Sequence, residues 1–256
     1  MRTPFIAANW KMYKTVLEAV AFVKELRKLA KDLYDVEIVI APPFTALRPA
    51  ADAAHASNIG IAGQNLHWER EGAFTGEVSA GMLKEAGAEY VIIGHSERRR
   101  LFGDTDQTVN RKLLAAIASQ LTAIVCIGET LEERDRNETL TVLDRQIKDG
   151  LDSVTADQIA GLVIAYEPVW AIGERGIPAT ADYADARQAE IIAVAEAVLG
   201  RKIPCLYGGS VNPQNCEELI SSPHIDGLFI GRSAWNVEGY LDILAKCATK
   251  LQGEKR

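Results

Sequence analysis

The sequence predicts a single α/β domain with the architecture of a (β/α)8 barrel. Eight short apolar runs, rich in isoleucine and valine, alternate with amphipathic stretches along the 256 residues, which is the size and order of that fold. The runs are mostly continuous instead of alternating, as expected of strands that are buried on both faces. A doubly wound open sheet would have a similar order. No linker rich in Pro, Gly or Ser divides the chain, so one domain over residues 1–256 is the better interpretation.

The expected elements follow one another in this order along the chain. Strands are predicted at residues 5–8, 36–40, 59–62, 90–93, 123–127, 162–166, 204–206 and 228–230. The spacing of apolar residues predicts helices at residues 16–33, 106–117, 142–151, 184–199 and 217–220. In the first of these, Val16, Ala19, Val20, Val23 and Leu26 fall on one helix face.

The composition limits the classes of function. A net charge of −7 and the lack of any run of five basic residues argue against nucleic-acid or anionic-membrane partners. No apolar run approaches the ~18 residues of a membrane span, and residues 4–8 are too few for the apolar core of a signal peptide. The four cysteines (Cys126, Cys205, Cys216 and Cys247) form no C-x-x-C pair, which favours reduced thiols in a cytosol.

Polar residues gather just past the ends of the expected strands. In a parallel barrel these ends share one face, so residues that are distant in sequence converge on one mouth. The residues in question are Asn9 and Lys11, Gln64 and Asn65, His95 and Glu97, Glu129, Glu167, Ser210, and residues 231–233. We expect the chemistry of the protein at this mouth.

Glu167 stands at the end of a buried-looking strand and opens the most informative stretch. A lone carboxylate at a strand end usually caps or pairs with a neighbour. Here a stiff Pro168-Val169-Trp170 follows, and then Gly173 and Gly176. A fixed base before a segment that swings as a unit suits proton transfer that must be shielded from water. We expect burial under such a lid to raise the pKa of Glu167.

His95 follows the fourth expected strand. A single histidine in this position is more often structural than catalytic. Ser96 is expected to cap a short helix over residues 98–101, and a helix N-terminus beside an imidazole disfavours its protonation.

Two glycine-containing segments after the last two strands are candidates for binding phosphate. Gly208-Gly209-Ser210 alone would be an ordinary tight turn, but it is matched by Gly231-Arg232-Ser233 after the next strand. Backbone N–H groups in these two places form the phosphate site of many barrels. No nucleotide-binding glycine motif is present. Asp104-Thr105-Asp106 lacks the glycine and the distal glutamate of a calcium loop, so no metal site is expected.

Residues 65–79 form a long loop after the third strand and carry Trp68 and Phe74, which look exposed. A loop of this length in a compact domain usually has a function.

Five segments together resemble the triose-phosphate isomerase family over essentially the whole chain. They are Asn9-Trp10-Lys11-Met12, Gly94-His95-Ser96-Glu97-Arg98-Arg99, Cys126-Ile127-Gly128-Glu129-Thr130, residues 165–173 (AYEPVWAIG) and Tyr207-Gly208-Gly209-Ser210-Val211. The resemblance implies a single-domain TIM barrel that interconverts dihydroxyacetone phosphate and glyceraldehyde 3-phosphate in cytoplasmic glycolysis and gluconeogenesis. It implies no cofactor and no metal.

The resemblance also implies roles for individual residues. Glu167 would shuttle the proton, His95 would polarise the substrate oxygens as a neutral donor, and Lys11 would stabilise negative charge. Asn9 and Glu97 would have supporting roles. The substrate phosphate would be bound by Gly173, Ser210, Gly231 and Arg232, and the lid and its hinges would include Pro168, Val169, Trp170, Pro178 and Tyr207. Gln64, Asn65 and Thr75 would belong to the loop that forms a homodimer.

The chain departs from the triose-phosphate pattern in a few places. Tyr13 replaces the asparagine that often ends the first motif. After Gly173 the lid is one residue longer, gains Glu174 and Arg175, and is stiffened by Pro178. The last motif, often Gly-Gly-Ala-Ser-Leu, ends here in Trp235, and residues 182–188 also differ.

These departures resemble a sister branch that isomerises erythrulose phosphate in tetritol breakdown. Triose phosphate is the first interpretation of the substrate. The alternatives are the four-carbon ketose phosphate and a barrel that only binds phosphorylated ligands. Because the front resembles one branch and the back the other, a recombined chain is a further alternative.

Overall fold

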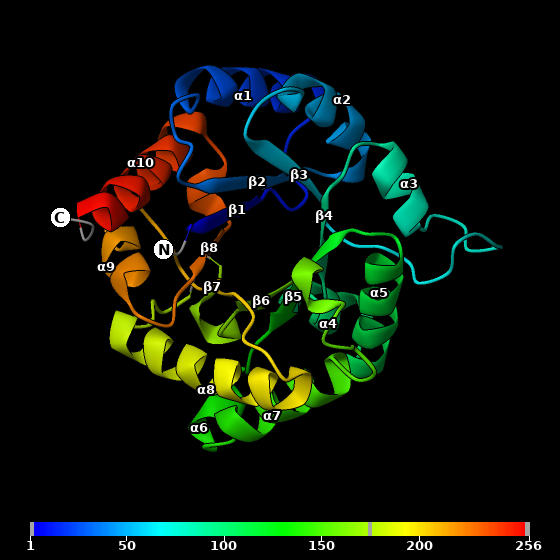
Figure 1. Cartoon of the computed structure of the whole chain (residues 1–256), viewed down its shortest axis with the longest axis vertical. Coiled ribbons are helices and arrows are strands. Elements are labelled where there is room, and N and C mark those ends of the chain that lie inside the picture. Colours follow the sequence, from blue (N-terminus) through cyan, green and yellow to red (C-terminus); the bar gives the residue numbers. More distant parts are fainter. Residues whose placement is uncertain (1–2, 174–175, 254–256) are drawn as a thin grey trace.

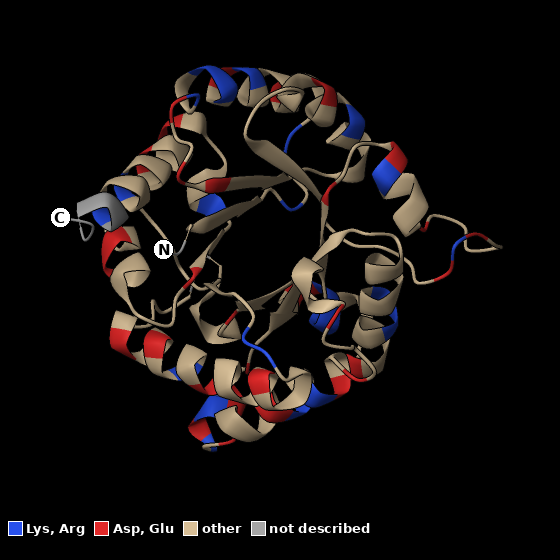
Figure 2. Cartoon of the chain, in the orientation of Figure 1, with Lys and Arg blue, Asp and Glu red and all other residues tan. Residues whose placement is uncertain are grey.

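The computed structural model describes residues 3–173 and 176–253 and has a closed barrel of eight parallel strands in the order of the sequence. Figure 1 shows the helices as a ring around the strands. Charged residues lie mostly on the helices and loops, and the strands carry few of them (Figure 2). The predicted fold class is therefore confirmed.

Every predicted strand is present, with ends that differ from the prediction by about one residue. The strands are β1 (Phe5–Asn9), β2 (Glu37–Ala41), β3 (Ile59–Gly63), β4 (Tyr90–Ile93), β5 (Thr122–Ile127), β6 (Leu162–Tyr166), β7 (Cys205–Tyr207) and β8 (Gly227–Ile230). Each is paired in parallel with both neighbours, and β1 closes the barrel on β8 with Phe5 opposite Gly227.

The helices were predicted less completely. The structure contains α1 (Val16–Leu29), α2 (Phe44–Ala54), α3 (Ala80–Glu85), α4 (Ser96–Phe102), α5 (Asp106–Ala118), α6 (Leu131–Asp135), α7 (Thr139–Gly150), α8 (Ala181–Leu199), α9 (Cys216–Ser221) and α10 (Val237–Gly253), with short 3-10 turns η1 (Ile159–Gly161), η2 (Val169–Ala171) and η3 (Arg232–Ala234). The first helix ends at Leu29 and not at Leu33. The prediction missed α2, which contains Pro49, the short α3 and α6, and α10.

The two faces of the strands build two separate cores. One set of alternate side chains fills the barrel interior: Phe5, Ala7, Val39, Ala41, Ala62, Ile92, Ile124, Cys126, Val163, Ala165, Leu206 and Phe229. The other set, which includes Ile6, Ile38 and Ile164, packs against the helices. Burial on both faces explains why the strands look like continuous apolar runs.

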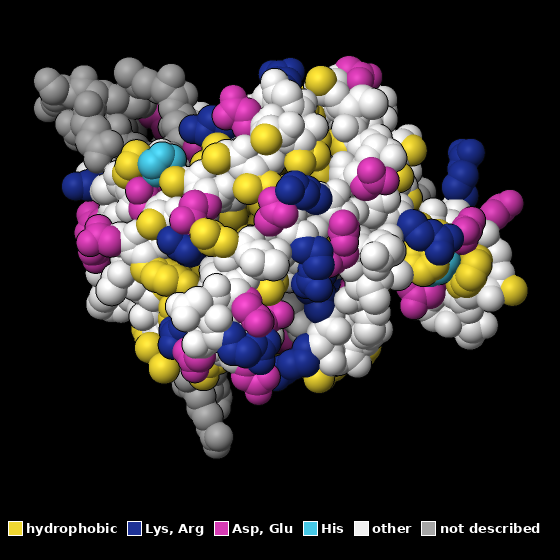
Figure 3. Space-filling view, turned by 90° about the horizontal axis from the view of Figure 1, so that it is seen from below, with side chains coloured by type: hydrophobic (Ala, Val, Ile, Leu, Met, Phe, Trp, Pro, Cys, Tyr) yellow, Lys and Arg dark blue, Asp and Glu magenta, His cyan; other side chains and the backbone are white. Residues whose placement is uncertain are grey.

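Residues 65–79 project from the body of the barrel, as the cyan loop in Figure 1 and the lobe in Figure 3 show. The loop is closed at its base by the bridge between His67 and Ser79, and the His67 ring lies 4.2 Å from those of Trp68 and Phe74. Phe74 is 43% exposed, as expected, whereas Trp68 is half-buried.

All four cysteines are free and buried. Within the described ranges no helix is long and apolar enough to cross a membrane.

Candidate active site

Closure of the barrel brings the polar strand ends together at one mouth. His95 and Glu167 lie at the centre: His95 Nε2 is 3.0 Å from Glu167 Oε1, and both side chains are about 95% or more buried. The second carboxylate oxygen, Oε2, accepts a hydrogen bond of 3.2 Å from the Ser96 N–H. A proton acceptor and a proton donor are thus held within one hydrogen bond of each other.

The hydrogen bonds of His95 define its tautomer. His95, not Ser96, is the N-cap of α4, because its Nδ1 accepts the N–H of Glu97 at 3.2 Å. With Nδ1 accepting, the ring hydrogen is on Nε2, which donates to Glu167. The geometry thus makes His95 a donor to Glu167, but the prediction that Ser96 caps the helix was wrong: a ring nitrogen replaces the usual hydroxyl.

The neighbours of Glu167 favour its ionised form. Burial raises its pKa, but the His95 ring, the Ser96 N–H and the Lys11 ammonium all favour the carboxylate and together lower the pKa below its ordinary value. The expectation of a raised pKa is wrong for this arrangement, because burial is outweighed by groups that stabilise the charge. Burial and the nearby Glu167 raise the pKa of the Cys126 thiol well above its usual range.

Two glycines allow the chain to pack closely around Glu167. A Cβ at Gly128 would lie 1.9 Å from the Glu167 carbonyl oxygen, and a Cβ at Gly208 would lie 2.9 Å from Glu167 Cγ. Gly208 therefore allows the close approach of the base to the strand end that follows β7.

Lys11 is positioned by its neighbours on both sides. Its backbone is left-handed, with φ 53°, and is held by a bond from its N–H to Asn9 Oδ1 (2.9 Å) and by Gln64 Nε2, which donates to its carbonyl at 2.8 Å. Its ammonium is 2.7 Å from Glu97 Oε1. The structure thus brings together Asn9, Lys11 and Glu97, with Asn9 bonded to the backbone of the lysine.

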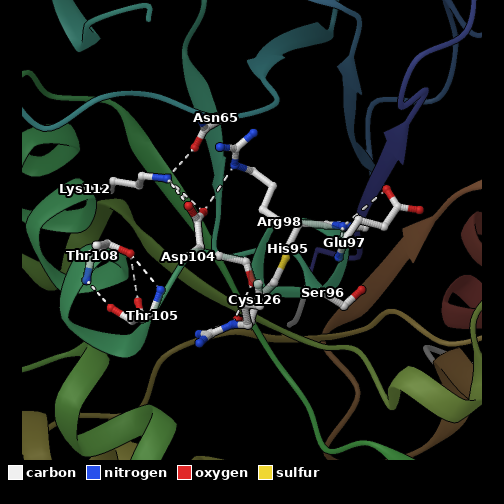
Figure 4. A network of polar contacts seen from close by, with 12 residues as sticks. Asn65, His95, Ser96, Glu97, Arg98, Asp104, Thr105, Thr108, Lys112 and Cys126 are labelled. Carbon is white, nitrogen blue, oxygen red and sulfur yellow. Dashed lines mark hydrogen bonds and ion pairs between the residues drawn. The ribbon is translucent and has the colours of Figure 1, made fainter. Parts of the chain in front are cut away.

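A buried charged network holds α4 in place (Figure 4). Asp104 accepts from Arg98 Nε at 3.2 Å and from Lys112 Nζ at 2.8 Å, and Lys112 also donates to Asn65 Oδ1 at 2.9 Å. Lys112 is 3% exposed; burial lowers its pKa and Asp104 opposes that shift. The network joins the base of the projecting loop to the helix that follows His95.

The neighbouring Arg99 is anchored in the same way. It donates to Asp106, to the Gly94 carbonyl (2.9 Å) and to the Cys126 carbonyl (3.3 Å). Asp104 and Asp106 therefore serve as anchors for Arg98 and Arg99, two of the three arginines of α4. Within the described residues no group of three His, Cys, Asp or Glu side chains is arranged to hold a metal.

Glu129 is a functional candidate whose role the sequence analysis did not assign. It is fully buried, and it accepts from the hydroxyls of Tyr166 (3.1 Å) and Tyr183 (3.2 Å) and from Trp170 Nε1 at 2.8 Å. Arg134 stacks on the Trp170 ring at 4.3 Å. The sequence signal for Glu129 was its position as a polar residue at a strand end. Its contact with Trp170, in the first hinge of the predicted lid, is visible only in the fold.

The predicted hinge residues occupy different environments. Pro168 precedes η2 and is buried, whereas Pro178 is exposed. The Trp170 carbonyl accepts the N–H of Ile177 at 3.0 Å, which ties the two ends of the lid together. Tyr207 is fully buried, and burial raises the pKa of its hydroxyl.

Only some of the residues predicted to bind the substrate phosphate lie close to Lys11 and the root of the lid. Ser210 Oγ donates to the Ala171 carbonyl at 2.7 Å, so it contacts the root of the lid. Gly231 lies beside Lys11, since a Cβ placed there would be 3.8 Å from Lys11 Cε. Gly173 is exposed with φ 87°, and Arg232 is exposed. Glu174 and Arg175, the charges expected at the lid tip, lie outside the described residues.

Of the predicted dimer-loop residues, two face the protein itself. Gln64 donates to the carbonyls of Lys11 and Ala41, each at 2.8 Å, and Asn65 accepts from Lys112. Thr75, at the tip of the loop, is exposed.

Comparisons with known proteins agree with this geometry. The family model described as "Triosephosphate isomerase" matches residues 4–247. The L-erythrulose-1-phosphate isomerase of Brucella abortus (strain 9-941) is 54% identical and aligns with 97% of this chain and 98% of its own. The enzyme of the same name from Rhizobium rhizogenes is 55% identical, with 98% and 97% covered.

Triosephosphate isomerases are also similar. That of Carboxydothermus hydrogenoformans is 50% identical over 95% of this chain and 98% of its own. The crystal structure of triosephosphate isomerase from Bartonella henselae superposes with a TM-score of 0.86 at 40% identity, covering 95% of this chain and 98% of that one. The matching family model, the closed barrel and the convergence of Lys11, His95 and Glu167 all lead to one statement: this chain belongs to the triosephosphate isomerase family of isomerases.

Proposed function

We propose that the protein moves a carbonyl group between adjacent carbons of a small phosphorylated ketose, with Glu167 as the base. The observation that carries the proposal is the contact between Glu167 Oε1 and His95 Nε2, at 3.0 Å, beside the Lys11–Glu97 pair. A buried carboxylate next to two donors suits a reaction in which negative charge develops on a substrate oxygen.

The residues divide the proposed reaction between them. Glu167 takes a proton from the carbon beside the carbonyl, and His95 Nε2–H and the Lys11 ammonium stabilise the enediolate oxygen that results. His95 then relays a proton between the two oxygens, and Glu167 returns its proton to the former carbonyl carbon. Protons and electrons balance within the substrate, so the reaction needs no cofactor.

Glu167 has to change partners during this cycle. Its carboxylate is bonded to Ser96 N–H and to His95. For Glu167 to reach a substrate carbon while His95 Nε2–H donates to the substrate oxygen, both bonds have to be released. We propose that the substrate phosphate is bound near Gly173, Ser210, Gly231 and Arg232, where backbone N–H groups follow β6, β7 and β8.

We propose an erythrulose phosphate as the preferred substrate. The departures in the lid and after β8 support it, as do the names of the Brucella and Rhizobium relatives. L-Erythrulose 1-phosphate is dihydroxyacetone phosphate in which one hydrogen of the reacting carbon is replaced by a hydroxymethyl group. The same proton transfer would move its ketone from C2 to C3, so the same three side chains serve both substrates.

Triose phosphate is the second candidate, and it would place the protein in glycolysis and gluconeogenesis. The 50% identity to the Carboxydothermus enzyme favours it. A pocket distinguishes two substrates that differ by one hydroxymethyl group by only ~1–3 kcal/mol, or roughly 10–200-fold in kcat/KM. The two activities therefore differ by a measurable ratio.

A two-substrate assay tests these proposals. Initial rates with L-erythrulose 1-phosphate and with dihydroxyacetone phosphate should give kcat/KM values that favour the four-carbon substrate by about tenfold or more. A reversed ratio would favour the triose reaction. Binding of phosphorylated ligands without turnover of either substrate would refute both enzyme functions and favour a binding protein.

We also propose a homodimer that buries the projecting loop. Several large apolar side chains near this loop and the barrel mouth are exposed: Met12 (93%), Phe102 (66%), Leu101 (61%), Met82 (55%) and Phe74 (43%). Exposed apolar surface of this extent marks an interaction site, and a two-fold pairing would cover it twice.

Sedimentation at micromolar protein concentration tests the assembly. Leu101→Glu should shift the dimer toward monomer. Leu140→Glu is the matched control, because Leu140 is 49% exposed on α7 and should leave the assembly unchanged. A parent protein that is monomeric and fully active would contradict the proposal.

We further propose that the protein works in a reducing compartment, the cytosol, which its free cysteines support.

A further inference from the structure

Two loops at the mouth of the barrel are joined by aromatic and polar contacts. The loop after β1 carries Tyr13 and Lys14, and the loop after β8 carries Trp235. The Tyr13 and Trp235 rings have centroids 3.9 Å apart and are inclined by 37°. Lys14 Nζ donates to the Trp235 carbonyl at 2.6 Å.

The loop after β1 has a backbone that needs such support. Lys11 and Lys14 both have positive φ angles, 53° and 77°, which L-residues with a Cβ adopt at a cost in free energy. The first is held by Asn9 and Gln64. The second is held through its side chain, which lies over the rings of Trp10 and Phe22 and reaches Trp235.

The loop after β8 is fixed from its own side. Trp235 directly follows η3, and its N–H donates to the Arg232 carbonyl at 3.1 Å. Ser233 Oγ donates to the Val211 carbonyl at 2.8 Å. Because Gly231 lies against the Lys11 stem, the distance between Lys11 and this loop depends on the contacts that Tyr13 and Lys14 make with Trp235.

We propose that Tyr13, Lys14 and Trp235, the aromatic clasp, position Lys11 against residues 231–234, so that one ammonium serves both the reacting oxygen and the phosphate of the substrate. This role rests on the function proposed above. Tyr13 and Trp235 stand where the triose-phosphate pattern has asparagine and leucine. These two departures in sequence are in contact in the fold, and neither asparagine nor leucine could make the ring contact.

A double-mutant cycle tests the clasp. Tyr13→Asn and Trp235→Leu should each raise KM and weaken the binding of inorganic phosphate by about three- to tenfold, with a smaller change in kcat. The double variant should be no weaker than the worse single variant, because either substitution already opens the clasp. Tyr13→Phe keeps the ring and should stay within about twofold of the parent. Lys14→Met keeps the apolar stem and should weaken phosphate binding.

Binding of inorganic phosphate is measured by 31P NMR well below the melting temperature, so this arm does not depend on turnover. Sedimentation must show the parent's assembly state, since Tyr13 is 51% exposed near the proposed subunit contact. Single effects that simply multiply in the double variant would overturn the clasp. A lowered Tm with unchanged KM and unchanged phosphate binding would also overturn it. If the clasp variants weaken phosphate binding but the parent protein turns over neither sugar phosphate, the proposed function is refuted and the role of the clasp in positioning Lys11 is still supported.

Discussion

The two sides of the barrel mouth hold their buried carboxylates in different ways. On the α4 side, Asp104 is paired with two cations, Arg98 and Lys112. At the root of the lid, Glu129 accepts its hydrogen bonds from neutral groups, the hydroxyls of Tyr166 and Tyr183 and the indole of Trp170.

The difference separates a fixed wall from a surface that can move. Breaking a buried ion pair costs about 3–5 kcal/mol, because a charge is left without its partner. Removing one neutral donor from a carboxylate that keeps its other donors costs about 1.5–3 kcal/mol. The α4 side, which positions His95 and Glu97, is therefore rigid, whereas the lid root can release Trp170 at modest cost. Glu167 belongs to both sides, since its backbone follows β6 and its carboxylate is bonded to the α4 side.

The largest effect is expected at the point where the two sides meet. Glu167→Gln removes the base and should lower kcat by about 10²–10⁴-fold while phosphate binding persists. Steady-state kinetics with the better substrate measures it. Glu196→Gln on the exposed face of α8 is the control and should be neutral. Near-normal turnover by Glu167→Gln would refute the assignment of the base.

The rigidity of the α4 side is tested by Lys112→Met. The variant leaves Asp104 without its buried lysine, and the free energy of unfolding should fall by about 3–5 kcal/mol in urea. The control is Lys148→Met, whose pair with Asp144 is exposed and should contribute at most about 0.5 kcal/mol. Equal losses in both variants would remove the contrast between the two sides.

The pH dependence of stability tests how firmly Glu167 is held. Its folded-state pKa is lowered, so its contribution to stability is complete above the unfolded value and is lost as the pH falls through the folded value. The difference in unfolding free energy between the parent and Glu167→Gln should be constant from about pH 7 to about pH 5 and change in favour of the variant below that.

A 13C NMR titration of the Glu167 carboxyl gives the same quantity directly. The pKa should rise in His95→Leu, which removes the Nε2–H donor. A carboxyl that titrates above its ordinary value in the parent protein would contradict the hydrogen-bonded arrangement.

The smallest effect is expected at the root of the lid. Tyr183→Phe keeps the ring that packs on Trp170 and removes one of the donors to Glu129, so the loss of stability should be about 1.5–3 kcal/mol. Tyr34→Phe, at a residue that is 77% exposed, is the control for loss of a hydroxyl. A loss as large as that of Lys112→Met would mean that the lid root is as rigid as the α4 side.

The strand positions and the residues at the barrel mouth could be predicted from the sequence alone. Buried parallel strands leave a local pattern, the apolar run followed by a polar residue, and closure of the barrel then brings Lys11, His95 and Glu167 together whatever lies between them. The helices were harder to predict, because α2 contains a proline and α3 and α6 are only one to two turns long.

The contacts between side chains of different elements could not be predicted and became visible only in the folded chain. The tautomer of His95, the lowered pKa of Glu167, the donors around Glu129 and the contact of Tyr13 with Trp235 all join residues whose sequence spacing carries no signal of their pairing. Helix and strand patterns record period and burial within one element, whereas these pairings depend on how closed strands and their loops are arranged in space. The choice between a three-carbon and a four-carbon substrate is of this second kind, because it depends on the space under the lid and not on the residues that transfer the proton.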